Sequence, residues 1–404
     1  MSRKFNTPPD ADLSEALGKT VQVPHPPYSP AALRRWPDVD SPDLLASDAA
    51  DRLILDESAA AREAAADDTI VVIGDEYGAL TLGVADAGAS GIRVHQDSLA
   101  GERALAANAD TAGLRAGFRS MPLDATLVAG ARVVLLRLPR ALDALDDIAA
   151  LIAAHADPEV VVFAGGRIKH MALAMNDVLR RSFSTLDISH ARQKSRVLIA
   201  RAPHDGHDPA PQRAQHDAPG LATPLAVCAF GGAFAGTGID IGTRFLLEQL
   251  AAADGLDASR GDVIDLACGT GVIATWLALR HPSLSVVATD RSAVAVASAR
   301  ATVAANGVAE RVEVVRDLGL ESRPDASARL VALNPPFHAG TAVPMTGVAD
   351  PLFAEAGRVL APGGELWAVW NSSLQYRPAL ERLVGPTRQV ARNAKFTVTV
   401  STRR

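Results

Sequence analysis

The chain has 404 residues, of which 48% are hydrophobic, 21% charged and 4% aromatic, and its formal net charge is −6. This length predicts two domains, and the scarcity of aromatic residues argues against an all-β sandwich. No apolar run is long enough to span a membrane, the first residues lack the apolar core of a secretory signal, and Cys228 and Cys268 fit no disulfide framework or zinc spacing. We therefore expect a cytoplasmic globular protein without a metal.

The first half of the chain shows alternating strands and helices behind an irregular start. Residues 1–40 are rich in Pro and Asp and include Pro24-His-Pro-Pro-Tyr-Ser-Pro30, so we expect an extended or mobile segment. Residues 41–202 form the first predicted domain, with apolar strands at 69–73, 91–95, 132–136 and 160–163 separated by Ala-rich helices.

A polar segment at residues 203–224, dense in Pro, His, Asp and Gly, is predicted to link the two domains. His204, His207 and His216 could suggest a metal site, but a linker is favoured because no fixed helical or hairpin spacing would bring them together.

Residues 225–404 form the second predicted domain, which repeats the same order of elements. Strands are expected at 262–266, 285–290, 312–315, 330–333, 365–370 and 395–401, helices at 271–279, 293–306, 351–360 and 378–384, and a turn at 362–364. The pattern predicts an α/β fold with two tandem doubly wound, mostly parallel sheets that arose by internal duplication.

A glycine turn, Asp265-Leu-Ala-Cys-Gly269-Thr-Gly271, lies where the first strand of the second domain passes into a helix. Open α/β sheets bind ligands at this edge, and glycines let the backbone approach a ligand closely. Asp290, 25 residues after Asp265, ends the next strand and could accept hydrogen bonds from two ribose hydroxyls. A nicotinamide cofactor is less favoured, because the full Gly-x-Gly-x-x-Gly is missing and Asp265 suits a ligand that carries an ammonium group.

Asp317 follows the third strand, where it could accept a hydrogen bond from an adenine amino group, with Leu318 packing on the ring. A surface turn is the alternative for Asp317. Residues 262–370 resemble the class I S-adenosylmethionine-dependent methyltransferases, with Rossmann-like domains. The resemblance implies S-adenosylmethionine as cofactor and a binding site formed by Asp265, Ala267, Gly269, Gly271, Asp290, Arg291, Asp317, Leu318 and Asn334.

The most specific motif is Asn334-Pro335-Pro336-Phe337, directly after the fourth strand. An amino group on a heteroaromatic ring is a poor nucleophile because its lone pair is delocalised. The Asn334 amide oxygen and the Pro335 carbonyl could accept its two hydrogens and direct the lone pair toward a methyl donor. Phe337 could stack on a base. The alternative is a simple strand-ending proline turn.

This turn, followed by His338, resembles that of the ribosomal RNA guanine-N2 methyltransferases, the RsmC/RlmG family. The run 238–244 and the C-terminal pattern with Tyr376 and residues 393–396 are also similar, closest to RlmG. The resemblance implies methylation of a guanine N2 in ribosomal RNA, with 23S favoured over 16S. Implied substrate contacts are Phe234, His338, Asn371, Lys395 and Phe396; for His338 a packing role is favoured, and for Asn371 and Phe396 it is equally weighted.

The first half resembles the degenerate methyltransferase domain of this family. Aligning Gly78 with Gly271 puts Glu76 opposite Gly269, and aligning Pro139 with Pro335 puts Leu138 opposite Asn334. A glutamate would repel a methionine carboxylate, so we expect no cofactor in this half and a role in RNA binding or support.

Two basic stretches close the two halves. Residues 166–201 hold eight basic and two acidic residues, and residues 376–404 hold seven and one, so each carries about +6. Solvated surfaces are the simpler explanation for either stretch alone, but both together suggest an RNA surface that includes Arg167, Lys169, Arg180, Arg181 and Lys395. We expect a monomer that acts on ribosomal RNA or a ribosomal subunit.

Three rival functions stay open: a protein glutamine methyltransferase, a small-molecule N-methyltransferase, and a non-catalytic RNA-binding assembly factor. The first would favour a tyrosine in place of Phe337 and would not need the basic stretches. The intact glycine turn and Asn334 argue against the third.

Overall fold

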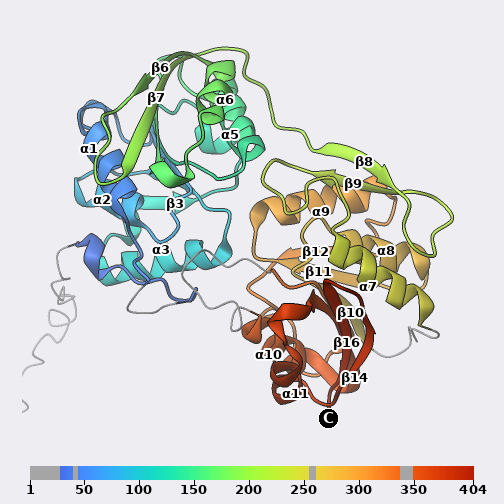
Figure 1. Cartoon of the computed structure of the whole chain (residues 1–404). Coiled ribbons are helices and arrows are strands. Elements are labelled where there is room, and N and C mark those ends of the chain that lie inside the picture. The colour runs from blue at the N-terminus through green and yellow to red at the C-terminus, as the bar shows by residue number, and fades with distance from the viewer. Residues whose placement is uncertain (1–27, 40–43, 254–260, 337–348) are drawn as a thin grey trace, which may run out of the picture.

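The computed structural model describes residues 28–39, 44–253, 261–336 and 349–404, which form two α/β lobes (Figure 1). The sheet of the first lobe has the strand order β3-β2-β1-β4-β5-β7-β6. Its strands are β1 (Ile70–Ile73), β2 (Ile92–His95), β3 (Phe118–Ser120), β4 (Val133–Arg137), β5 (Val161–Arg167), β6 (Phe183–Ile188) and β7 (Ser195–Pro203). Its helices are α1 (Ala49–Glu63), α2 (Ala79–Asp86), α3 (Leu99–Ala112), α4 (Ala125–Val128), α5 (Leu142–His155) and α6 (Ala174–Ser182).

The second lobe repeats this topology with the order β12-β11-β10-β13-β14-β16-β15. Its strands are β10 (Asp262–Leu266), β11 (Val286–Asp290), β12 (Val312–Arg316), β13 (Ala328–Leu333), β14 (Leu360–Asn371), β15 (Thr387–Arg392) and β16 (Phe396–Thr402). Its helices are α7 (Ile241–Ala252), α8 (Val272–Arg280), α9 (Ala293–Ala305), α10 (Asp350–Val359) and α11 (Arg377–Leu383). In both sheets the first five strands in this order run parallel, and the sixth, β7 or β16, runs antiparallel to its neighbours on both sides, which confirms the predicted tandem, doubly wound and mostly parallel fold.

Strand β10 shows why the apolar runs form central strands. Val263 packs into the core that includes residues of α7, α8 and α9, whereas Ile264 and Leu266 pack into the core of α10 on the opposite face. A parallel strand that is covered by helices on both faces needs apolar residues at successive positions. No helix in the described part of the chain is long and apolar enough to cross a membrane.

The structure differs from the sequence prediction in three respects. The turn expected at 362–364 lies inside β14, which begins at Leu360, and the register shifts there so that Ala328 pairs with Leu360 and Leu330 with Glu365. Strands β3, β6 and β7 of the first lobe and β15 of the second were not predicted. The linker predicted at 203–224 contains β8 (Gln212–His216), which pairs antiparallel with β9 (Leu225–Ala229). The domain boundaries themselves stay a prediction.

The β8–β9 ribbon lies along α9 (Figure 1). The amides of Ala226, Cys228 and Phe230 donate to Asn306 Oδ1 at 3.0 Å, Thr302 Oγ1 at 2.9 Å and Ser298 Oγ at 3.0 Å. These bonds, one per helical turn, fix the start of the segment that leads to Phe234.

The two lobes contact each other through topologically equivalent loops, one after β2 and one after β11. Ser98 and Ser292, which precede α3 and α9, form an antiparallel bridge. A second contact joins the Gly231 amide to Asp147 Oδ2 on α5 at 2.8 Å. The first lobe therefore touches both the loop that carries Asp290 and the segment that carries Phe234.

Candidate active site

The glycine turn between β10 and α8 combines three residues with left-handed backbone: Ala267 (φ 55°), Gly269 (φ 53°) and Gly271 (φ 75°). A Cβ added at Gly269 would meet no atom within 4 Å, so this glycine borders open space. A Cβ at Gly271 would lie 2.9 Å from the Cβ of Ala299 on α9. The two positions therefore need glycine for different reasons. Gly269 leaves room for a ligand, and Gly271 lets α8 pack closely against α9.

A pocket brings together three segments that are far apart in the sequence. It is lined by residues between Phe234 and Thr243, by the glycine turn from Ala267 to Ile273, and by Asn334. Phe234 is 59% exposed, as expected of a side chain at the edge of a pocket that could contact a ligand. Among the described residues, no three His, Cys, Asp or Glu side chains are placed to hold a metal ion.

The orientation of the Asn334 amide is defined by its neighbours. Its Nδ2 donates to Asp240 Oδ2 at 3.1 Å and to Thr243 Oγ1 at 2.9 Å. Because a carboxylate can only accept, the nitrogen must face Asp240. Asn334 Oδ1 is left as a buried acceptor without a partner among the described residues. A buried acceptor without a donor is costly, and a ligand amino group would satisfy it.

Asp240 and Thr243 were not predicted as site residues. Asp240 is the N-cap of α7 and accepts the amides of Gly242 at 2.8 Å and Thr243 at 3.2 Å. Their signal in the sequence was the run 238–244, but nothing in it pointed to Asn334, which lies 94 residues away. Pro335 is buried beside Asn334, while the predicted Phe337 and His338 lie outside the described residues.

Two carboxylates lie behind the glycine turn. Asp265 is fully buried; its Oδ2 accepts the Ala274 amide at 2.9 Å, and its Oδ1 has no partner among the described residues. Burial, together with the charge of Asp290, raises the pKa of Asp265 to about 7. Asp290 accepts the amides of Gly269 at 3.0 Å and Ser292 at 2.9 Å, so it braces the turn. Arg291, also predicted to bind the cofactor, is half exposed and pairs with Asp38 at 3.6 Å.

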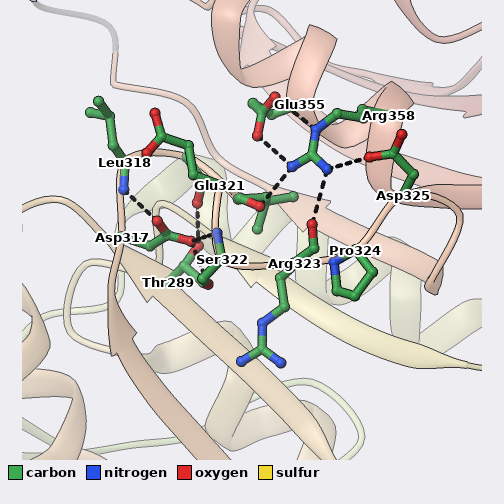
Figure 2. Close-up of polar contacts among 12 residues, drawn as sticks. Thr289, Asp317, Leu318, Glu321, Ser322, Arg323, Pro324, Asp325, Glu355 and Arg358 are labelled. Atoms are coloured by element: carbon green, nitrogen blue, oxygen red, sulfur yellow. Dashed lines mark hydrogen bonds and ion pairs between the residues drawn. The ribbon is translucent and has the colours of Figure 1, made fainter. Parts of the chain in front are cut away.

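Asp317 is buried and organises its own loop, as Figure 2 shows. Its Oδ1 accepts the Leu318 amide at 2.8 Å, and its Oδ2 accepts the Ser322 amide at 3.0 Å and hydroxyl at 2.7 Å. Arg358 secures the far side of this loop by donating to the carbonyls of Leu320 at 2.8 Å and Arg323 at 2.9 Å. The predicted adenine contact through Asp317 and Leu318 would therefore use a preformed loop.

The remaining predicted substrate residues lie in different surroundings. Asn371 caps the short 3₁₀ turn Ser372–Leu374 and accepts the Ser373 amide at 3.1 Å. Phe396 is only 3% exposed and belongs to the core against α7, which favours packing over substrate contact among its two predicted roles. The exposed Lys395 lies over the Phe396 ring at 5.2 Å.

The first basic stretch is partly neutralised by carboxylates on helices α6 and α5. Arg180 pairs with Asp177 at 3.4 Å, and Arg181 pairs with Asp146 of α5 at 3.1 Å. Arg167 and Lys169 make no ion pair with a described residue. The pKa of His170 is lowered by desolvation and by the charges of Arg140, Lys169 and Arg167.

The corresponding turn of the first lobe keeps the left-handed backbone conformation, but it carries a glutamate side chain where Gly269 leaves open space. Glu76 has φ 53°, the value of its counterpart Gly269. The carboxylate of Asp75 accepts the amides of Leu80 and Thr81, each at 2.7 Å, at the start of α2. Tyr28 covers this helix end by donating from its hydroxyl to the Ala79 carbonyl at 2.9 Å. In the first lobe a carboxylate of the turn itself therefore caps the following helix, whereas in the second lobe the amide equivalent to that of Thr81, that of Ala274, is bonded to Asp265 on β10.

Known proteins with similar sequences cover both lobes. Residues 24–204 match the family model "RLMG N-terminal domain", and residues 224–400 match "Methyltransferase small domain". The ribosomal RNA large subunit methyltransferase G of Streptomyces avermitilis is 34% identical over 378 residues, which cover 92% of this chain and 97% of that protein. The protein of the same name from Pseudomonas aeruginosa is 35% identical over 379 residues, with the same coverage.

A solved structure shares the tandem fold. The 16S rRNA N2 methyltransferase RsmC of T. thermophilus, in complex with AdoMet and guanosine, superimposes with a TM-score of 0.70 at 21% identity, over 88% of this chain and 92% of that one. At this identity the similarity shows the fold alone. The identity to the large-subunit enzymes over nearly their whole length shows more: the chain belongs to the ribosomal RNA large subunit methyltransferase G family.

Proposed function

We propose that this protein transfers a methyl group from S-adenosylmethionine to the exocyclic N2 of a guanine in 23S ribosomal RNA. The observation that carries the proposal is the buried, unsatisfied Asn334 Oδ1, held beside an open glycine turn by Asp240 and Thr243. The names of the large-subunit relatives support the RNA, and the guanosine and AdoMet of the T. thermophilus neighbour support the base and the cofactor.

The residues of the second lobe fit the cofactor. The open space at Gly269 and the amides that begin α8 suit the methionine carboxylate, and the partnerless Asp265 Oδ1 suits a positive charge near it. We assign the ribose to Asp290 and the adenine to the loop of Asp317 and Leu318. When bound, S-adenosylmethionine supplies an electrophilic methyl group on a sulfonium.

The chain's own residues prepare the nucleophile. Asn334 Oδ1 and the Pro335 carbonyl accept the two amino hydrogens, which pulls the nitrogen toward a pyramidal shape and directs its lone pair. No general base is required, because the nitrogen loses its proton after it has become cationic. As positive charge develops on the nitrogen, its hydrogens become stronger donors and their hydrogen bonds to these two oxygens strengthen. An interaction that is stronger in the transition state than in the ground state lowers the barrier. Phe337 is assigned to stack on the base.

For the RNA surface we propose Arg167 and Lys169, joined by Arg140, over Arg180 and Arg181, because the last two already have carboxylate partners. Phosphate contacts need cationic side chains without a carboxylate partner. Each such contact releases a counterion from the RNA backbone. Phe234, Asn371 and Lys395 are proposed contacts near the pocket. A monomer that needs no metal and acts in the cytoplasm is part of the same proposal.

A methyl-transfer assay with tritiated S-adenosylmethionine tests this function. The substrates are unmodified transcripts of 23S and 16S ribosomal RNA and a ribosomal protein fraction, followed by digestion to nucleosides and amino acids. The proposal expects label in N2-methylguanosine from 23S RNA. Label in methylglutamine would support the protein-methylating alternative, and RNA binding without transfer would support the assembly factor.

A further inference from the structure

Both loops that we assign to the adenosine part of the cofactor are bonded to one segment of the first lobe, residues 96–102. This segment runs from the end of β2 into α3 and has no role in the proposed chemistry. It contacts Ser292 and Val294, which follow Asp290, and Arg316, which precedes Asp317.

Asp97 supplies the cap of α9 from the other lobe. Its side chain Oδ1 accepts the Val294 amide at 2.8 Å and the Ser292 hydroxyl at 2.9 Å, and its carbonyl accepts the Ala293 amide at 2.8 Å. The first amides of a helix have no partner within the helix, so they need acceptors from outside. Asp97 accepts the first two amides of α9, those of Ala293 and Val294. Ser292 Oγ accepts the third, that of Ala295.

Arg316 makes the second attachment. It ends β12 and donates to the carbonyls of Gln96 at 2.9 Å and Asp97 at 3.1 Å, and it pairs with Glu102 at 2.8 Å. Its side chain is 25% exposed and that of Glu102 is 31% exposed, so this contact is largely withdrawn from water. The backbone of Asp317 follows immediately, and its amide is bonded to the Asp290 carbonyl at 3.0 Å.

We propose that Asp97 and Arg316 are positioning residues for cofactor binding, so that the non-catalytic lobe sets the affinity of the catalytic lobe for S-adenosylmethionine. The proposal rests on the proposed function and adds the residues through which the first lobe acts. Asp97 holds Ser292, whose amide is bonded to Asp290 Oδ1 at 2.9 Å, and Arg316 holds the start of the Asp317 loop. Without these attachments the two loops must be ordered by the ligand, and the cost of ordering reduces affinity.

The test compares Asp97→Ala, Asp97→Asn and Arg316→Gln by isothermal titration with S-adenosylmethionine and S-adenosylhomocysteine. Asp97→Ala removes two hydrogen bonds to the α9 start, and we expect a Kd about threefold to tenfold higher, where tenfold corresponds to about 1.4 kcal/mol. Asp97→Asn keeps an oxygen that can accept both bonds, so it should restore affinity to within about twofold. Arg316→Gln should weaken binding in the same direction.

Arg103→Ala is the matched control, because Arg103 also joins the lobes, to Glu321, through an ion pair in which both side chains are more than 40% exposed. It should leave the Kd unchanged. Thermal unfolding without ligand separates positioning from general destabilisation: the inference requires weaker binding in Asp97→Ala even at temperatures where the unliganded variant is fully folded.

The outcomes separate this inference from the proposed function. If the wild-type protein does not bind S-adenosylmethionine, the proposed function fails. If the wild type binds and Asp97→Ala binds equally well, the positioning role is overturned while the proposed function stands. An equal loss in Arg103→Ala, or a loss in Asp97→Asn as large as in Asp97→Ala, also overturns it.

Discussion

Replacing Asn334 by alanine removes the acceptor that we assign to the guanine amino group and should reduce kcat far more than it affects cofactor binding. One preorganised polar contact to a charge that develops in the transition state is worth about 10²–10³ in kcat, or about 2.7–4 kcal/mol. The loss to folding is smaller, because Asp240 keeps the amides of Gly242 and Thr243. We expect a destabilisation of about 1 kcal/mol.

The assay is single-turnover transfer of tritiated methyl groups to a 23S transcript, with the Kd of S-adenosylmethionine measured in parallel. Thr243→Val is the matched comparison: it removes one bond to Asn334 Nδ2 but leaves Oδ1 and the bond to Asp240, so its loss in rate should stay below about tenfold. A folded Asn334→Ala protein with a rate within threefold of wild type would refute the assignment of Oδ1 to the amino group.

Three further predictions concern the cofactor site and the RNA surface. Gly269→Glu introduces the residue that its counterpart Glu76 shows is compatible with φ 53°, so the variant should fold but lose measurable S-adenosylmethionine binding by calorimetry. Burial raises the pKa of Asp265 to about 7, above its value in the unfolded chain. The unliganded protein should therefore lose stability as the pH rises from about 4 through 7, and thermal unfolding of Asp265→Asn should lack this component. Reversing the charges of Arg140 and Lys169 should weaken RNA binding and reduce the salt dependence of the binding constant, with the cofactor Kd unchanged; an unaltered salt slope would exclude this surface.

The central strands could be predicted from the sequence because each is a short apolar run that is buried on both faces, as in β10 and β13. Strand β15 could not, because most of its residues, Thr387–Arg392, are exposed or half-exposed, and its one fully buried position gives no pattern. Strand β8 is polar, and its extended conformation depends on pairing with β9. Edge strands of this kind are specified by their neighbours and not by their own composition.

In the candidate site, too, residues in local motifs could be predicted, whereas contacts between distant segments could not. The glycine turn and Asn334 could be predicted because each follows a strand at the ligand-binding edge of the sheet. Counting charges along the chain overstated the basic surface, since Arg181 is neutralised by Asp146, 35 residues away. The contact of Asp97 with Ser292 spans 195 residues and has no local signal. Contacts between the lobes depend on how the two folded lobes pack against each other, so they cannot be predicted from a local sequence motif.

Mass spectrometry of ribosomal RNA from cells that lack this protein tests whether the Asn334 turn methylates a guanine of 23S ribosomal RNA. We predict that one N2-methylguanosine disappears from 23S RNA and returns when the wild-type protein, but not Asn334→Ala, is expressed. An unchanged set of 23S methylations, or full restoration by Asn334→Ala, would contradict it.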